Sequence, residues 1–382
     1  MARTNTTSLE EWTNALPTDS EKNEMFELIS MLYPMETYDN LNNSLLTENF
    51  PHLAKVMQLT VLENRFCVIH EPLDATSPSF KFPRFFGFIV LRAEQGVSKR
   101  LHHSAAHFET DGHVCRQASA MFSQTGSKSL VVAGASRWAV KGSNPSPCQR
   151  SNQIADASHN TDLMFHVANV ALWEAAKRYS TSRQNLIDHF IQWHGMAETS
   201  CPNSMAFISV GASLKHSVYQ NDNLYANRLK SSLNQITGYK FAQTPQTDMK
   251  CSLRATTNVF GRVINGVHVG DECLALAPSK SILGNFIHIE QKNQSREDLS
   301  LWVKALNRIQ DDTPSRSSRN GFHPRAISSK GQNGKTKHKK LRSPKNAEIK
   351  KRRTRKTHSP LRTRKAHSPQ RSRSNNRLKS RF

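Results

Sequence analysis

The chain has 382 residues, a formal net charge of +23, 36% hydrophobic residues and six cysteines. This hydrophobic content excludes a wholly disordered chain, and the length provides for a sizeable folded core. The longest strongly apolar run, residues 85–91, is far shorter than a membrane-spanning helix, so we expect no membrane partner. The cysteines are widely spaced and form no Cys-x-x-Cys pair, which favours an intracellular protein with free thiols over a disulfide framework.

The first 142 residues predict a subdomain that is helical at its start and then rich in strands. Ser8 followed by Glu11 has the spacing of a capping box, and residues 19–33 place apolar side chains on one helical face before Pro34. The pattern then changes to short runs rich in Val, Ile, Phe and Trp that are bounded by Pro, Gly or Ser. These predicted strands are residues 65–71, 84–92, 130–133 and 136–141.

Residues 160–312 predict a second subdomain of mixed α/β character, after a loop over 143–159. Two helices, residues 162–179 and 182–195, are expected to form a helical hairpin. The remaining predicted elements are a helix over 223–236, a hairpin turning at Asn265-Gly266 within 263–269, a strand over 282–289 and a closing helix that starts at Ser295. The fold class predicted for the whole chain is α+β, with a helical N-terminus, a mixed body and a disordered basic tail.

One histidine-rich stretch raises the question of a metal site. Its members are His102, His103, His107, His113 and Cys115, and His103 and His107 are spaced as if one helical turn apart. No second cysteine pair closes the site, so we expect packed or solvent-facing imidazoles, with no metal and no cofactor. The sequence also contains no G-x-S-x-G, no H-E-x-x-H and no spaced acidic set typical of a nuclease, so we expect no enzyme.

The positive charge is confined to the end of the chain. Of the 53 Lys and Arg residues, 24 lie in residues 315–382, together with a single acid, Glu348. Residues 1–314 therefore hold 29 basic and 29 acidic side chains, and their charges balance. The tail has too few apolar residues to offset about 1–2 kcal/mol of ordering entropy per residue, so we expect disorder. A neutral body with a cationic tail indicates binding to a polyanion.

A nine-residue near-repeat, residues 353–361 and 362–370, places basic side chains between Ser-Pro steps. Closely spaced phosphates of RNA or DNA are the partner that this charge density suits, without reading of bases. The predicted phosphate contacts are Lys350, Lys351, Arg352, Arg353, Arg355, Lys356, Arg362, Arg364, Lys365, Arg371 and Arg373. Residues 350–356 also suit recognition by a nuclear import receptor. Ser343, Ser359 and Ser368 each precede Pro, and their phosphorylation would reduce the positive charge.

Residues 172–193 contain Leu172-Trp173, a nine-residue gap and then Arg183-Gln184-Asn185-Leu186-Ile187-Asp188-His189-Phe190-Ile191-Gln192-Trp193. This segment resembles the core protein of hepadnaviruses, whose chain also ends in an Arg-rich tail with Ser-Pro steps. The resemblance implies a helical hairpin and a viral nucleocapsid that assembles as a homo-oligomer.

The leading functional hypothesis is therefore a nucleic-acid-binding structural protein that coats or packages a genome, in a virion or the host nucleus. A cellular nuclear RNA- or chromatin-associated protein with an SR-like tail is the alternative. A third hypothesis is an enzyme that acts on nucleic acid and uses the tail as an affinity arm. The sequence leaves open whether the polymer is RNA or DNA.

Overall fold

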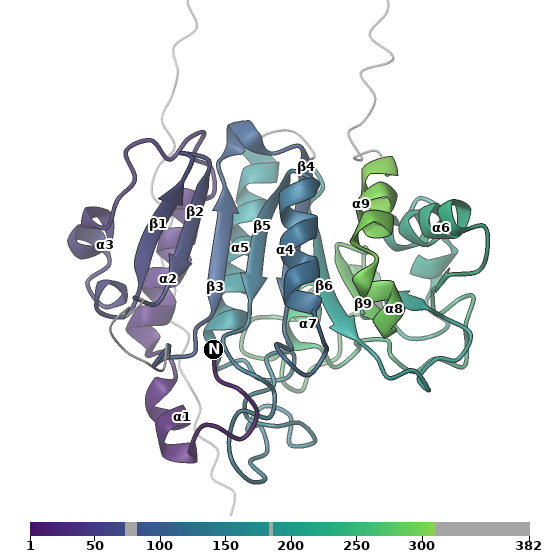
Figure 1. Cartoon of the computed structure of the whole chain (residues 1–382), viewed down its shortest axis with the longest axis horizontal. Helices are drawn as coiled ribbons and strands as arrows, with labels where there is room; N and C mark the ends of the chain where they lie inside the picture. Colours follow the sequence, from purple (N-terminus) through teal and green to yellow (C-terminus); the bar gives the residue numbers. More distant parts are fainter. Residues whose placement is uncertain (73–81, 183–185, 310–382) are drawn as a thin grey trace, which may run out of the picture. The chain divides into compact units, whose positions relative to one another are not determined.

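The computed structural model describes residues 1–72, 82–182 and 186–309. These residues build a nine-stranded mixed sheet with helices on both faces and additional helices at the N-terminus (Figure 1). The predicted fold class of the body is confirmed. The predicted tail, residues 315–382, lies outside the described residues together with its phosphate-contact and phosphorylation residues.

The strands lie in the order β1-β2-β3-β5-β4-β6-β9-β7-β8. Their bounds are β1 (Gln58–Leu62), β2 (Phe66–His70), β3 (Phe88–Arg92), β4 (Lys99–Ala105), β5 (Ser127–Val132), β6 (His189–Gly195), β7 (Ala206–Ser209), β8 (Ala242–Gln243) and β9 (Phe286–Gln291). The four central strands β5, β4, β6 and β9 run parallel to one another, whereas β1, β2 and β3 form an antiparallel edge. Both predicted subdomains contribute strands to this one sheet.

Helices cover the two faces of the sheet. Their bounds are α1 (Leu9–Ala15), α2 (Asp19–Leu32), α3 (Ser44–Asn49), α4 (Val114–Gln124), α5 (Met164–Ser182), α6 (Tyr225–Thr237), α7 (Val259–Ile264), α8 (Asn293–Glu297) and α9 (Leu299–Arg308). In Figure 1, α4 lies in front of the sheet and packs against α9, which in turn contacts α6. Helix α5 lies behind the sheet, where it packs against α2 and α7. The sheet therefore separates two hydrophobic cores.

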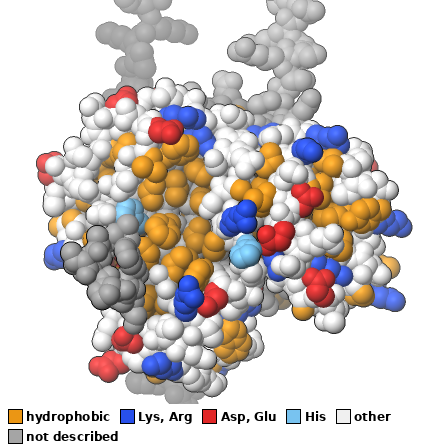
Figure 2. All heavy atoms as spheres, in the orientation of Figure 1, with side chains coloured by type: hydrophobic (Ala, Val, Ile, Leu, Met, Phe, Trp, Pro, Cys, Tyr) orange, Lys and Arg blue, Asp and Glu red, His pale blue; other side chains and the backbone are white. Residues whose placement is uncertain are grey.

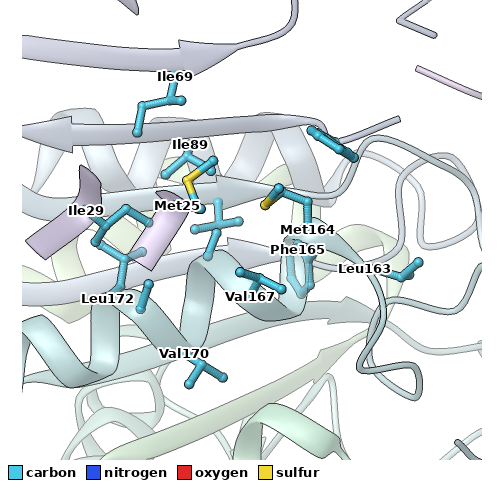
Figure 3. Packing of buried hydrophobic residues seen from close by; sticks show 14 of the residues in the cluster. Met25, Ile29, Ile69, Ile89, Leu163, Met164, Phe165, Val167, Val170 and Leu172 are labelled. Atoms are coloured by element: carbon cyan, nitrogen blue, oxygen red, sulfur yellow. The ribbon is translucent and has the colours of Figure 1, made fainter. Parts of the chain in front are cut away.

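The core behind the sheet joins α2 and α5 to the strands. Met25 and Ile29 of α2 meet Leu172 of α5 beneath Ile69 and Ile89 (Figure 3). The core in front is built from α4, α6 and α9 and contains the fully buried Trp193 and Trp302, which meet edge to face. Helix starts follow the sequence signals: Ser8 Oγ accepts from Glu11 N at 3.0 Å, and Glu11 Oε2 accepts from Ser8 N at 2.8 Å. The predicted capping box is confirmed.

The predicted helical hairpin over 162–195 is wrong in its second half. Helix α5 ends at Ser182, and His189–Gly195 is the central strand β6. Strand β6 pairs in parallel with β4 and β9 and is buried on both faces, so its apolar run lacks the alternation of a half-exposed strand. A short continuous apolar run is equally compatible with a buried helix, so the pattern did not distinguish the two. The second helix on which the resemblance to viral core proteins depends is absent from the described residues.

Two further predicted elements differ. The expected hairpin at Asn265-Gly266 is the end of helix α7, where Gly266 adopts φ +89°. A glycine in the left-handed region terminates a helix as readily as it forms a hairpin turn. Residues 136–141 form an isolated bridge at Val140 instead of a strand. The closing helix begins after Asp298, whose carboxylate accepts from Leu301 N at 3.0 Å.

Four of the six cysteines form disulfides, so the expectation of free thiols is wrong for them. Cys148 pairs with Cys273, and Cys201 pairs with Cys251. Their wide spacing in sequence concealed this, because the loops that carry them meet only through the fold. Disulfides persist in oxidising compartments and are rare in the cytosol, which weighs against a reducing location. Among the described residues no helix is both long enough and apolar enough to cross a membrane.

The front of the sheet is only partly covered. Phe66 of β2 and Phe88 and Val90 of β3 are only half-buried at the margin of the front core. Figure 2 shows hydrophobic side chains gathered left of centre on this face. Helix α4 covers the neighbouring strands β4 and β5 instead.

Candidate metal centre

Functional side chains converge where the parallel strands end. In open sheets of this kind, ligands bind outside the carboxyl ends of the strands, at the point where successive connections leave in opposite directions. The chain leaves β4 toward β5 on one side and leaves β6 toward β7 on the other side. This point therefore falls between β4 and β6 (Figure 1). His107 follows β4, and His194 lies near the end of β6. The next strand, β9, brings His288 and Glu290 to the same region.

Three ligand atoms form a nearly equilateral triangle at this point. His194 Nδ1 lies 3.0 Å from His107 Nδ1 and 3.2 Å from Asp111 Oδ2, and His107 Nδ1 lies 3.1 Å from the same Asp111 oxygen. Zinc–nitrogen bonds of about 2.0–2.1 Å in a tetrahedral site separate ligand atoms by about 3.3 Å. Two histidines and one carboxylate are also a donor set of catalytic zinc sites, which keep one position open. The three residues fit a zinc ion.

The opposite nitrogen of each imidazole is held by an acceptor. His107 Nε2 lies 2.9 Å from Asp156 Oδ1, and His194 Nε2 lies 2.8 Å from Gln192 Oε1. Each acceptor favours a proton on Nε2, which leaves the Nδ1 lone pair directed into the triangle. Gly195 N donates to Asp111 Oδ2 at 3.1 Å and fixes the carboxylate. The side chains of His107, His194 and Asp111 are therefore each oriented by a further hydrogen bond.

The site already attracts positive charge. Arg137 donates to Asp111 Oδ1 at 2.6 Å and also contacts His107 Nδ1. Burial disfavours a charged imidazole at His107, but the carboxylates of Asp156 and Asp111 outweigh it and raise the pKa of His107 to about 9. Burial likewise opposes ionisation of Asp111, yet His107 and His194 hold the pKa of this carboxyl well below its usual range. In the metal-free protein His107 therefore also carries a proton on Nδ1, and zinc binding would have to displace this proton and the contact with Arg137.

A cavity of about 360 Å³ opens beside the triangle. Its wall includes His107, His194, Arg137 and Glu290. Burial and the negative charge of Asp111 raise the pKa of Glu290 to about 7. A carboxyl with a near-neutral pKa can both accept and return a proton at physiological pH. The arrangement places a candidate general base next to a candidate metal ion.

His194, His288 and Glu290 form a second group with ligand atoms within 4.8 Å of one another. It shares His194 with the first group, and the Nδ1 atom of His194 faces His107 and Asp111 while its Nε2 atom faces Gln192. Only His288 and Glu290 then remain for a second ion. Within the described part of the chain, the geometry supports one three-ligand site.

The histidine-rich stretch does not form the site that its spacing suggested. Because β4 is a strand and His107 lies beyond its end, His103 and His107 are not one helical turn apart. His102 stacks on Phe190, and His103 stacks on Trp193. Burial lowers the pKa of His103 to about 3. His113 is exposed and pairs with Glu297 at 2.8 Å. Packed or exposed imidazoles are therefore confirmed for these histidines, whereas His107 joins the triangle.

Sequence reasoning missed Asp111, His194, Glu290 and Arg137. Charged or imidazole side chains inside otherwise apolar strands were the available signal, because burial of such groups is costly without a partner. His194 lies in Phe-Ile-Gln-Trp-His-Gly, and Glu290 in Phe-Ile-His-Ile-Glu-Gln. Only the sheet order shows that these two strands are neighbours.

A second buried polar cluster lies toward the opposite ends of the strands. Asp188 Oδ1 accepts from Arg100 Nε at 3.0 Å and lies 3.0 Å from His102 Nε2. Glu94 pairs with Arg100 at 2.7 Å and with the fully buried Lys128 at 3.1 Å. Burial opposes ionisation of Asp188, but contacts with His102 and Arg100 lower its pKa to about 2. The charges of these buried side chains are thus balanced within the cluster, which is typical of a structural network.

No protein-family model matches the chain, and comparison with curated proteins finds no similar sequence. The function must therefore be argued from the site itself.

Proposed function

We propose that the chain is a zinc-dependent hydrolase that cleaves an amide or ester bond. The observation that carries the proposal is the triangle of His107, Asp111 and His194 beside Glu290, at the wall of a cavity. A zinc ion held there would supply Lewis acidity and activate a water molecule at neutral pH. This proposal departs from the expectation of a non-enzymatic protein, which rested on the absence of sequence motifs.

Side chains of the protein would supply proton transfer, charge stabilisation and orientation of the ligands. Glu290 accepts the proton of water as the water oxygen bonds to the substrate carbonyl carbon, and returns it to the leaving group when the carbon–nitrogen or carbon–oxygen bond breaks. Arg137 carries positive charge beside the ligands and can stabilise the negative charge that develops on the carbonyl oxygen. Asp156 and Gln192 keep the two imidazoles oriented.

Two other chemistries use related donor sets. Hydrolysis of phosphodiesters commonly uses two ions about 3.5–4 Å apart, whereas the described residues supply ligands for one. Two histidines and one carboxylate also hold non-haem iron in oxygenases. The adjacent Glu290, a candidate general base on the wall of the same cavity, favours hydrolysis. Iron in the purified protein would favour the oxygenase instead.

The test compares Glu290→Gln with wild type. The variant should keep its zinc, measured by mass spectrometry, and lose about 100-fold or more of its hydrolysis of a mixed library of peptides and aryl esters. Glu297→Gln is the matched control, because Glu297 pairs with the exposed His113 and does not line the cavity. Equal turnover by wild type and Glu290→Gln would refute the assignment of the base.

Composition supports a second function for the C-terminal segment. Residues 315–382 contain 24 basic residues and one acid, which favours sequence-tolerant binding of RNA or DNA. Coating or packaging a nucleic acid, self-association and nuclear import remain proposals that rest on this segment. A hydrolytic body with a polyanion-binding arm accommodates both functions in one chain.

A further inference from the structure

The cavity beside the triangle contains one cation that no carboxylate of the described residues neutralises. Arg254 lines the cavity, and its guanidinium makes no hydrogen bond or ion pair with any of the described residues. Other side chains of the cavity wall have partners: Arg137 pairs with Asp111, Glu290 lies 3.5 Å from His288 Nε2, and His159 contacts Gln149 Oε1 at 2.8 Å. A guanidinium that lines a cavity without a protein partner keeps its planar set of N–H donors available for an anion.

The loop that presents Arg254 is fastened at both ends. Cys251 is tied to Cys201, and Asn258 caps α7 by accepting from Gly261 N at 2.8 Å. Asn258 also donates to Gln192 Oε1 at 2.5 Å, which links the loop to the acceptor that orients His194. The loop is thereby attached to the candidate metal centre.

The backbone next to Arg254 is strained. Ala255 has a φ of +54°, in the left-handed region that residues other than glycine seldom adopt. Such a conformation is unfavourable and persists only where surrounding contacts enforce it. Here the disulfide and the helix cap supply that enforcement. Strained backbone of this kind is concentrated at binding and catalytic sites.

We propose that Arg254 selects substrates that carry a carboxylate next to the scissile bond, such as peptides with a glutamate or aspartate at that position. The inference rests on the proposed hydrolase function and gives it a substrate class. A guanidinium binds a carboxylate through two parallel hydrogen bonds, and hydrogen bonds to charged groups contribute about 1.5–3 kcal/mol. Arg254 is a specificity residue here and takes no part in proton transfer.

The experiment uses the zinc-loaded full chain and peptide pairs that differ only in glutamate, glutamine, lysine or phosphoserine beside the cleaved bond. Wild type should prefer glutamate to glutamine by about 10- to 100-fold in kcat/KM, and Arg254→Ser should lose this preference. Lys250→Ser is the matched control, because it removes the same charge from an exposed position just before Cys251, outside the cavity. Zinc content and circular dichroism should stay unchanged in both variants.

A binding measurement separates the two proposals. N-acetylglutamate should raise the melting temperature of wild type and Lys250→Ser, but not that of Arg254→Ser. If no peptide is cleaved and this difference persists, the hydrolase proposal fails while the carboxylate site stands. Equal cleavage of the glutamate and glutamine peptides, or an unchanged preference in Arg254→Ser, would overturn the specificity assignment alone. A preference for phosphoserine over glutamate would show that the site selects phosphate instead.

Discussion

Removal of zinc should lower the stability of the body, because the triangle holds two imidazole nitrogens and a carboxylate oxygen within 3.2 Å of one another. A ligand that binds only the folded state stabilises it by about 2.7 kcal/mol when present at 100 times its dissociation constant. At about 2.1 cal/mol/K of unfolding entropy per residue, one kcal/mol shifts the melting temperature of a body of this length by roughly 1.5 °C. Zinc at that concentration should therefore raise the melting temperature of chelator-treated protein by roughly 4 °C.

The assay is differential scanning fluorimetry with and without zinc, combined with metal analysis of the purified chain. Asp111→Asn keeps the size of the side chain but removes the charged ligand oxygen, so most of the zinc-dependent rise should disappear. His113→Ala is the control, since His113 is 69% exposed and pairs with Glu297 outside the triangle. A wild-type protein that binds less than a tenth of an equivalent of zinc, with no change in melting temperature, would refute the metal assignment.

Three further predictions concern stability and the tail. Asp188→Asn should lower the free energy of unfolding by about 2 kcal/mol at pH 6, because Arg100 then keeps only the carboxylate of Glu94 as its charged partner. The pKa of Asp188 falls from 3.8 to about 2 on folding, so its contribution of about 2 kcal/mol to stability is present above pH 4 and is lost as the pH falls toward 2. In urea denaturation, the free energies of unfolding of wild type and Asp188→Asn should therefore become equal near pH 2. Reduction of Cys148–Cys273 and Cys201–Cys251, which span 125 and 50 residues, should remove about 4–5 kcal/mol each, measured by denaturation with and without dithiothreitol. Truncation after Pro314 should abolish salt-dependent binding of RNA and DNA in fluorescence anisotropy; affinity that survives at physiological salt would contradict a role for the tail.

Local signals in the sequence predicted much of the secondary structure. The capping box at Ser8 forms as expected, and the predicted helix over 223–236 is close to α6 (Tyr225–Thr237). These elements are specified by contacts within a few residues. The helix predicted over 182–195 failed because its residues form a strand buried on both faces. In such a strand, burial comes from neighbours that are distant in sequence, and the periodicity does not reveal it.

The candidate site was concealed for the same reason. His107 was noticed only as one of several clustered histidines, while Asp111, His194 and Glu290 carried no recognisable motif. The parallel pairing of β4, β6 and β9 brings them together, because the carboxyl ends of these strands meet at one edge of the sheet. The disulfides followed the same rule, since loops remote in sequence meet only after the sheet has formed.

By itself, the sequence determined the neutral body, the cationic tail and the mixed α/β class, because charge, composition and local periodicity are properties of the chain alone. The tertiary structure decided which polar groups share a site, which cysteines pair and which cation lacks a partner. Those outcomes depend on distances between residues far apart in the chain, and the order of the strands sets these distances.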